Sequence, residues 1–179
     1  MAKNQLKKCG LHITFLLVTA TGFCQSEFVR NNGTQVRINP GCQVIFADGG
    51  MEHSAGALSN AGELVVEGSL INAGTLTGGT NSGVFRVLND VENNGIMNPG
   101  QSLFELYGDA QFLRGGQPLS FYDLTLMGTG VKYMQQEIFT AGTLDLTDRE
   151  LRAFNYTVNH TNPTATSVLA MHNEGFVSA

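Results

Sequence analysis

The sequence predicts an all-β chain folded as a β-solenoid, a stack of short coils turned at glycine and asparagine. No window shows sustained helical periodicity, and short apolar runs are closed by glycine, asparagine or aspartate instead. Turn signals recur, with Asn60–Gly62, Asn72–Gly74 and Asn93–Gly95 each preceding an apolar residue. The 179 residues include 22 glycines and only 14% charged residues, which suits narrow coils that bury a small core between neighbours.

The first element, residues 1–24, is predicted to be a secretory signal peptide. It opens with Lys3, Lys7 and Lys8, and an apolar run of ten residues follows at Leu11–Ala20. A membrane span needs about 20 such residues, so this run is too short to be one. Cleavage after Cys24 is the preferred interpretation. Cleavage after Gly22 and lipidation at Cys24 are the alternatives.

The second element, residues 25–179, is predicted to be a single β-repeat domain. Its 7 basic and 15 acidic residues give it a net charge of −8, which disfavours nucleic acid as a partner because that recognition needs basic patches. Removal of the signal peptide would leave Cys42 as the one cysteine. We expect Cys42 to be buried, since it abuts the apolar run Val44–Phe46.

Eleven short strands are predicted within this domain. In the clearest of them, Asp123–Leu126 and Thr143–Leu146, apolar and polar residues alternate, so each strand buries one face only. The full set is Val36–Ile38, Gln43–Ala47, Glu63–Val66, Ser69–Ile71, Val84–Leu88, Leu103–Tyr107, Asp123–Met127, Val131–Met134, Thr143–Leu146, Tyr156–Val158 and Val168–Met171.

A longer echo supports the repeat architecture. The triplets Asn39–Gly41 and Asn98–Gly100 both read Asn-Pro-Gly and lie 59 residues apart. Glycine supplies the positive φ that sharp turns need, and asparagine tolerates it. Because the spacing of the turns is irregular, a β-sandwich is the alternative fold.

Part of this pattern resembles a known group of proteins. Ser120–Lys132 reads Phe-Tyr-x-Leu-x-Leu, then a glycine-rich turn and a lysine, and Ala141–Leu146 adds Gly-x-Leu-x-Leu. With the Asn-Ala-Gly-x-Leu units upstream, the match covers roughly residues 55–150 and resembles large exported proteins of Bacteroidota. The resemblance implies an adhesin-like protein, secreted or on the outer cell surface, often exported by the type IX route. It carries over no functional residue.

The end of the chain departs from that group. Such proteins usually finish in a C-terminal sorting domain, whereas Phe176–Ala179 reads like the middle of a strand. We therefore expect the 179 residues to be a fragment of a longer protein or a truncated gene product.

Residues that could carry catalysis are scattered. His53, His160 and His172 have no metal-ligand spacing, so no metal residue is assigned. His53 and Ser54 are adjacent, and neighbours on a strand face opposite sides of a sheet. Hence no catalytic or cofactor-binding residue is assigned, and the chain is predicted not to be an enzyme.

The acidic group Asp145, Asp148 and Glu150 leaves two alternatives open. We expect these carboxylates to pair locally with Arg149 and Arg152. A calcium-stabilised binding module would instead use their oxygens as hard ligands. A carbohydrate-active β-helix enzyme, a polysaccharide lyase or hydrolase, would need two or three carboxylates to converge on one face with a lysine or arginine.

Aromatic side chains are the remaining candidates for binding. Tyr122 and Tyr133 are the speculative ligand-facing pair, although aromatics that fill coils are more common. The sequence therefore predicts a non-enzymatic structural or adhesin-like module without cofactors. Its expected partners are glycans or other surface proteins, together with edge-to-edge self-association at an uncapped coil.

Overall fold

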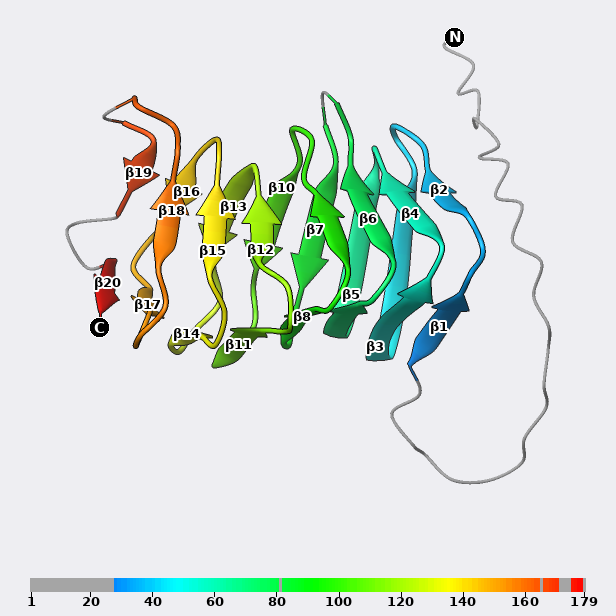
Figure 1. Ribbon diagram of the computed structural model, residues 1–179, viewed down its shortest axis with the longest axis horizontal. Helices are drawn as coiled ribbons and strands as arrows, with labels where there is room; N and C mark the ends of the chain where they lie inside the picture. The colour runs from blue at the N-terminus through cyan, green and yellow to red at the C-terminus, as the bar shows by residue number, and fades with distance from the viewer. Residues whose placement is uncertain (1–27, 81, 165, 171–174, 179) are drawn as a thin grey trace, which may run out of the picture.

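A computed structural model describes residues 28–80, 82–164, 166–170 and 175–178, so the predicted signal peptide lies outside the described residues. The described chain is a β-solenoid of about seven turns without a helix, in which successive coils stack along one axis (Figure 1). Glu63 pairs with Val84, and Val84 pairs with Leu103, so these coils are 21 and 19 residues long. This confirms the predicted fold class.

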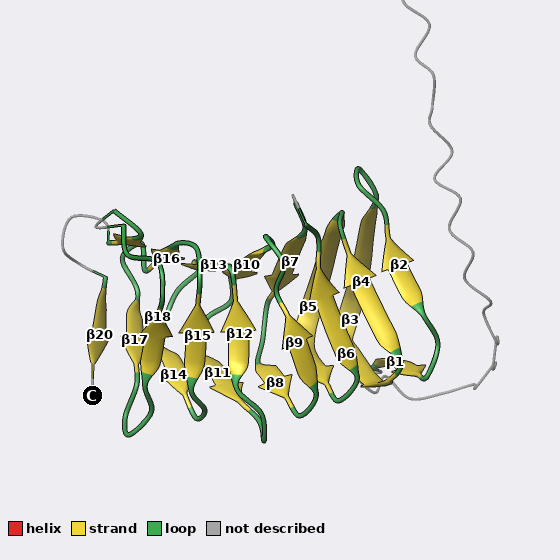
Figure 2. Cartoon of the chain, turned by 45° about the horizontal axis from the view of Figure 1, so that its top comes forward, coloured by secondary structure: helices red, strands yellow, loops and turns green. Residues whose placement is uncertain are grey.

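Each coil passes through three faces, seen from a second angle in Figure 2. The first face contains the first half of β3 (Gln43–Ala55), the first half of β5 (Glu63–Asn72), β7 (Val84–Val87), β10 (Leu103–Leu106), β13 (Asp123–Leu126), β16 (Leu144–Asp145) and β19 (Val168–Leu169). The second face contains β1 (Val29–Asn32), the second halves of β3 and β5, β8 (Val91–Asn93), β11 (Gln111–Arg114), β14 (Lys132–Met134), β17 (Glu150–Arg152) and β20 (Phe176–Ser178).

The third face consists of two smaller sheets. One contains β2 (Val36–Ile38), β4 (Ala57–Asn60), β6 (Thr75–Gly78) and β9 (Ile96–Asn98), and the other contains β12 (Leu119–Phe121), β15 (Ile138–Thr140) and β18 (Val158–His160). Pro118, which has no N–H to donate, precedes β12 at the interruption. There Gln117 N–H donates instead to the Asn93 carbonyl, so the coil stays attached to its neighbour.

Two glycines let β3 and β5 run from the first face to the second without a break. Gly50 has φ +117°, and the register of β3 against β5 shifts between Phe46 and Gly49. A Cβ atom at Gly68 would lie 2.5 Å from the carbonyl carbon of Gly49. Only glycine allows the two backbones to approach so closely at this bend.

Large apolar side chains stack in register through the interior. Leu64, Phe85, Phe104 and Leu124 occupy successive positions of the first face, and all are buried. The rings of Phe85 and Phe104 stack with centroids 4.3 Å apart. Phe121, from the third face, meets Phe104 edge-on at 4.9 Å. Each such side chain contributes roughly 1.5–3 kcal/mol through burial.

Polar side chains occupy the corner between the second and third faces. Asn31, His53, Asn72 and Asn93 are all buried and follow one another in register. Asn72 Nδ2 donates to Ile96 O at 3.2 Å, and Asn93 Nδ2 donates to Pro118 O at 2.7 Å. Each bond reaches a carbonyl of the following coil, so the side chains tie successive coils together.

His53 takes an asparagine's place in this corner. Its Nε2–H donates to the Thr75 carbonyl at 3.2 Å, so its Nδ1 accepts from Asn31 Nδ2 at 3.0 Å. That arrangement requires the neutral imidazole. Burial lowers the pKa of His53, and hydrogen bonds to the carbonyls of Thr75 and Gly56 oppose this in part.

The corners explain the irregular turn spacing in the sequence. Asn60 lies between the third and first faces, where its Nδ2 donates to Val84 O at 2.8 Å. Asn72 and Asn93 lie at the corner between the second and third faces. The motif at Asn60–Gly62 is therefore separated from that at Asn72–Gly74 by part of a coil, and Asn93–Gly95 follows one full coil later.

The fold corrects three expectations. Every strand pairing among the described residues is parallel, so the alternative β-sandwich, which pairs antiparallel strands, is wrong. The predicted strand Tyr156–Val158 begins too early, because β18 starts at Val158. Cys42, which was expected to be buried, is only partly buried beside the core.

Many strands of the second and third faces were not predicted. β4, β6, β9, β12 and β15 on the third face carry only one or two large apolar residues each, between polar or small ones. Their pairing with neighbouring coils, rather than their own sequence, makes them strands. Within the described residues, no helix has the length and apolarity to cross a membrane.

We expect acid to destabilise the solenoid through His53. Because the folded-state pKa is lowered, the unfolded chain binds the proton more readily, so this contribution is complete above the unfolded value near 6.5 and is lost as pH falls below it. Urea unfolding at a series of pH values measures this. His53→Asn restores the residue found in the two following coils and should flatten the dependence between pH 7.5 and 5. An unchanged slope in this variant would contradict the assignment.

Candidate functional site

A column of aromatic and arginine side chains lies outside the second face. Phe112 on β11 and Tyr133 on β14 are register partners, and their rings stack with centroids 5.1 Å apart. Phe154, which follows β17, stacks on Tyr133 at 6.2 Å. The Arg152 guanidinium carbon lies 5.4 Å from the Tyr133 ring centroid. We call Phe112, Tyr133, Arg152 and Phe154 the aromatic column.

Phe154 is unusual in this column. It has φ +52°, a left-handed backbone conformation that is rare for a bulky residue and costs of order 1–3 kcal/mol. Phe154 is 48% exposed, so burial of its side chain does not explain this backbone conformation. The stack on Tyr133 offsets part of this strain.

The two predicted ligand-facing tyrosines lie in different places. Tyr133 belongs to the aromatic column, whereas Tyr122 lies at the bend between β12 and β13, where the third face meets the first. A Cβ atom at Gly142 would lie 2.8 Å from Cε1 of Tyr122, so that ring packs on the glycine of the next coil. Both tyrosines are half-buried against neighbouring coils. A role in ligand binding remains a prediction for each.

The stacking limits what the aromatic column can bind. A sugar stacks on a free ring face, but neighbours lie against the Tyr133 ring in both adjacent coils. The ring edges, the Tyr133 hydroxyl and the arginine N–H groups remain for a ligand. A broad, flat contact suits this arrangement better than a sugar held against one ring.

Charged side chains on the first face form a cluster across three coils. Arg86 on β7 reaches Glu63 on β5 at 2.7 Å and also bonds Glu105 on β10. The bond to Glu105 is the main cause that raises the pKa of Arg86. The sequence did not single out these residues, since they are 19 to 42 positions apart and only the coil length brings them together.

A second arginine is paired in the same way on the second face. Arg114 donates to Glu92 at 3.0 Å and lies 3.6 Å from a carboxylate oxygen of Asp90. Near the start of the stack, Arg30 pairs with Glu52 at 2.6 Å. Cross-strand pairs of opposite charge stabilise parallel rows of strands, so each of these carboxylates has a structural explanation.

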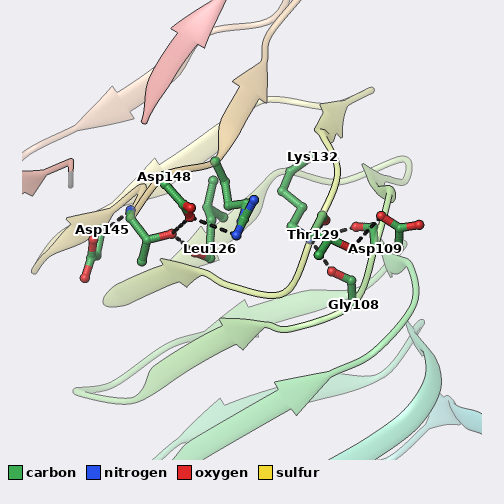
Figure 3. Close-up of polar contacts among 9 residues, drawn as sticks. Gly108, Asp109, Leu126, Thr129, Lys132, Asp145 and Asp148 are labelled. Carbon is green, nitrogen blue, oxygen red and sulfur yellow. Dashed lines mark hydrogen bonds and ion pairs between the residues drawn. The ribbon is translucent and has the colours of Figure 1, made fainter. Parts of the chain in front are cut away.

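In the acidic group noted in the sequence, Asp145 and Asp148 both accept hydrogen bonds from Thr147, whereas Glu150 has other partners (Figure 3). Asp145 accepts from Thr147 N–H at 2.9 Å, and Asp148 pairs with Arg149 at 2.9 Å. Glu150, farther along, accepts from Arg152 and from Ser178. Across the described ranges, no three His, Cys, Asp or Glu side chains are grouped to hold a metal ion.

The structure contains a serine–histidine contact that sequence reasoning missed. His160 Nε2 lies 2.6 Å from Ser167 Oγ, and His160 Nδ1 lies 2.7 Å from Thr140 Oγ1. Ser167 is buried, and its hydroxyl donates to Thr164 O at 2.6 Å. Its hydroxyl proton is thus directed at a carbonyl, and a hydroxyl, not a carboxylate, orients the imidazole. In contrast, His53 is buried while Ser54 bonds Glu52 outside.

Lys132 is another buried titratable residue whose environment the sequence did not indicate. It is fully buried at the corner between the first and second faces (Figure 3). Its Nζ donates to the carbonyls of Gly108, Asp109 and Thr129 at 2.8, 2.7 and 3.2 Å. The pKa of Lys132 is lowered to about 8, mainly by burial and in smaller part by the charge of Arg149, while Asp109 opposes the shift.

One coil earlier, Gln111 is the register partner of Lys132 and performs the same task. Its Nε2 donates to Val87 O and Asn89 O at 3.1 and 2.5 Å. The equivalence makes Lys132 a corner residue, with no role in binding that the geometry requires.

Comparison with known proteins does not extend this description. No protein-family model, curated protein or solved structure matches the chain.

We expect Lys132→Met to lower the free energy of unfolding by about 1–3 kcal/mol, because the carbonyls of Gly108, Asp109 and Thr129 lose a charged hydrogen-bond donor. Lys132→Gln should lose less, since Gln111 shows that a glutamine can serve this corner. Urea unfolding of the two variants measures the difference. Equal losses would mean that the side chain's length, and not its donor groups, stabilises the corner.

Proposed function

We propose that this chain is a non-enzymatic, adhesin-like structural module, exported through its N-terminal signal peptide and displayed outside the cell or on its outer surface. Its mechanism is the presentation of a rigid β-scaffold to glycans or other surface proteins. The resemblance to exported Bacteroidota proteins and the lysine-led apolar run at residues 1–24 support export. The resemblance alone also supports the type IX route.

The observation that carries the proposal is how the outer side chains are used. Arginines and carboxylates of successive coils pair with one another, as Glu63, Arg86 and Glu105 do. Aromatic rings stack along the same direction, as Phe112 and Tyr133 do. Because these side chains pair and stack with those of neighbouring coils, the flat faces keep one conformation. Such a surface loses little conformational entropy when a partner binds.

We expect the protein of the producing cells to be reached by protease added to intact cells or to be found in the medium. Intact-mass analysis should find Gln25 as its first residue. A periplasmic protein serves as the control that stays protected. Retention inside intact cells, with Met1 still present, would contradict the proposal.

A carbohydrate-active enzyme is the second candidate, and one cluster favours it. Glu63 and Glu105 converge on Arg86 on the first face, which is the pattern that such an enzyme requires. Both carboxylates, however, accept hydrogen bonds from the guanidinium. Both carboxylates are thus engaged in a structural ion pair with one arginine, whereas the two carboxyl groups of a glycosidase flank the bond that is cleaved.

We expect the purified chain to release neither reducing ends nor unsaturated ends from a panel of neutral and acidic polysaccharides. The matched variants are Glu105→Gln on the first face and Glu92→Gln on the second, since each carboxylate pairs with one arginine of a neighbouring coil. Release that is lost in Glu105→Gln and kept in Glu92→Gln would favour the enzyme over the scaffold.

A further inference from the structure

The last coil of the described stack leaves core positions exposed. On the first face, Val168 is the register partner of Leu144, which is buried, yet Val168 is 48% exposed. On the second face, Val177 follows the buried Leu151 and is 46% exposed. The outer edges of β19 and β20 also carry backbone groups that no strand of the described chain pairs (Figure 1). Such an end accepts a further parallel strand.

The first coil has matching features. Val29 on β1 is the register partner of the fully buried Met51 and is 46% exposed. Val44, at the start of the first face, is partly buried. Val44 and Val168 belong to one register series, which runs through Leu64, Phe85, Phe104, Leu124 and Leu144. The two ends of the stack thus present the two ends of the same core.

A second register series on the first face, whose side chains point outward, indicates that a second copy of the chain covers the ends of the stack. Ile45 and Leu169 stand at its two ends, and both are exposed. Between them, in register, lie Val65, Arg86, Glu105, Thr125 and Asp145. The series is apolar at the ends of the stack and polar over most of its length. Stacking one copy on another would place Leu169 beside Ile45 as an apolar cross-strand pair.

The number of strands in each face defines how two copies fit together. Within the described residues, the first face has seven strands, the third has seven and the second has eight. A second copy displaced along the stacking axis by seven coils would place its β3 beside β19 and its β2 beside β18. On the second face, β20 of one copy and β1 of the next would then fall at the same level.

One of those two strands must leave its place, and β20 is the less firmly held. β1 is fixed by the Arg30–Glu52 ion pair and by Asn31, which bonds His53 and Thr34. In β20, Phe176 and Val177 are about half exposed, and Ser178 donates a side-chain hydrogen bond to Glu150.

We propose that copies of this chain stack head to tail, with the first coil of one copy continuing the last coil of another and its β1 displacing β20. Strands run in the same direction in both copies, so the pairing stays parallel. The contact joins two different surfaces, so it does not close and generates filaments. The inference rests on the proposed scaffold role only for its use outside the cell.

Association of the purified mature chain tests the proposal. Light scattering after size exclusion should show mass that rises with concentration. Val29→Lys at the first coil and Val168→Lys at the last coil each place a charge where the interface would be buried. Each variant by itself then has only one kind of intact end, so it should run as a monomer. A mixture of the two variants should form dimers and nothing larger, because each variant retains one intact end.

Three outcomes would overturn this arrangement. A wild-type chain that stays monomeric at every concentration would show that the first and last coils do not bind each other. Loss in Val168→Lys alone indicates two last coils joined tail to tail. Weaker association after truncation behind Ala170 would show that β20 is part of the interface, whereas the proposal expects stronger association.

The matched control is Ile96→Lys, which changes a 57% exposed residue in the middle of the third face and should associate like the wild type. Circular dichroism of all variants confirms that each is folded. The measurement needs no cells, so it can fail while surface display of the protein succeeds, or the reverse.

Discussion

The corners of the coils set the constraint on which the rest of this solenoid depends. At a corner the backbone leaves one sheet before it joins the next, so its carbonyl groups would be buried without partners. Side chains at the corners provide these partners by donating to carbonyls of neighbouring coils or turns, as Asn72, Asn93, Gln111 and Lys132 do. Because an unpaired buried carbonyl costs about 1–3 kcal/mol, these bonds hold the coil length close to 20 residues.

A coil length close to 20 residues in turn determines which side chains meet on the outer faces. Arg86 finds carboxylates in both adjacent coils because every coil returns to the same position. The same regularity stacks Phe112 on Tyr133. Flat faces made of paired charges and stacked rings offer a firm surface, which is why a scaffold role accounts for these contacts more simply than catalysis does.

Regular stacking also makes the two ends of the described stack alike. Core side chains in the middle of the stack are covered by both neighbours, whereas Val29 and Val168 have a neighbour on one side only. Repeat proteins generally cover such ends with a polar capping unit. The apolar pair Ile45 and Leu169, at the ends of an otherwise largely polar series, is therefore the feature that connects the fold to the proposed head-to-tail stacking.

The sequence by itself determined the fold class and most strands of the first face. Apolar residues alternate there, and the Asn-x-Gly motifs mark the turns, both of which are local properties of the chain. Tyr133 could be singled out as an outer aromatic, but not its stacking on Phe112 and Phe154. Tertiary structure alone decided the three-sided path, the partners of Arg86 and the corner role of Lys132. Each depends on which residues lie one coil apart, and that register comes from hydrogen bonds between coils, which no local pattern in the sequence specifies.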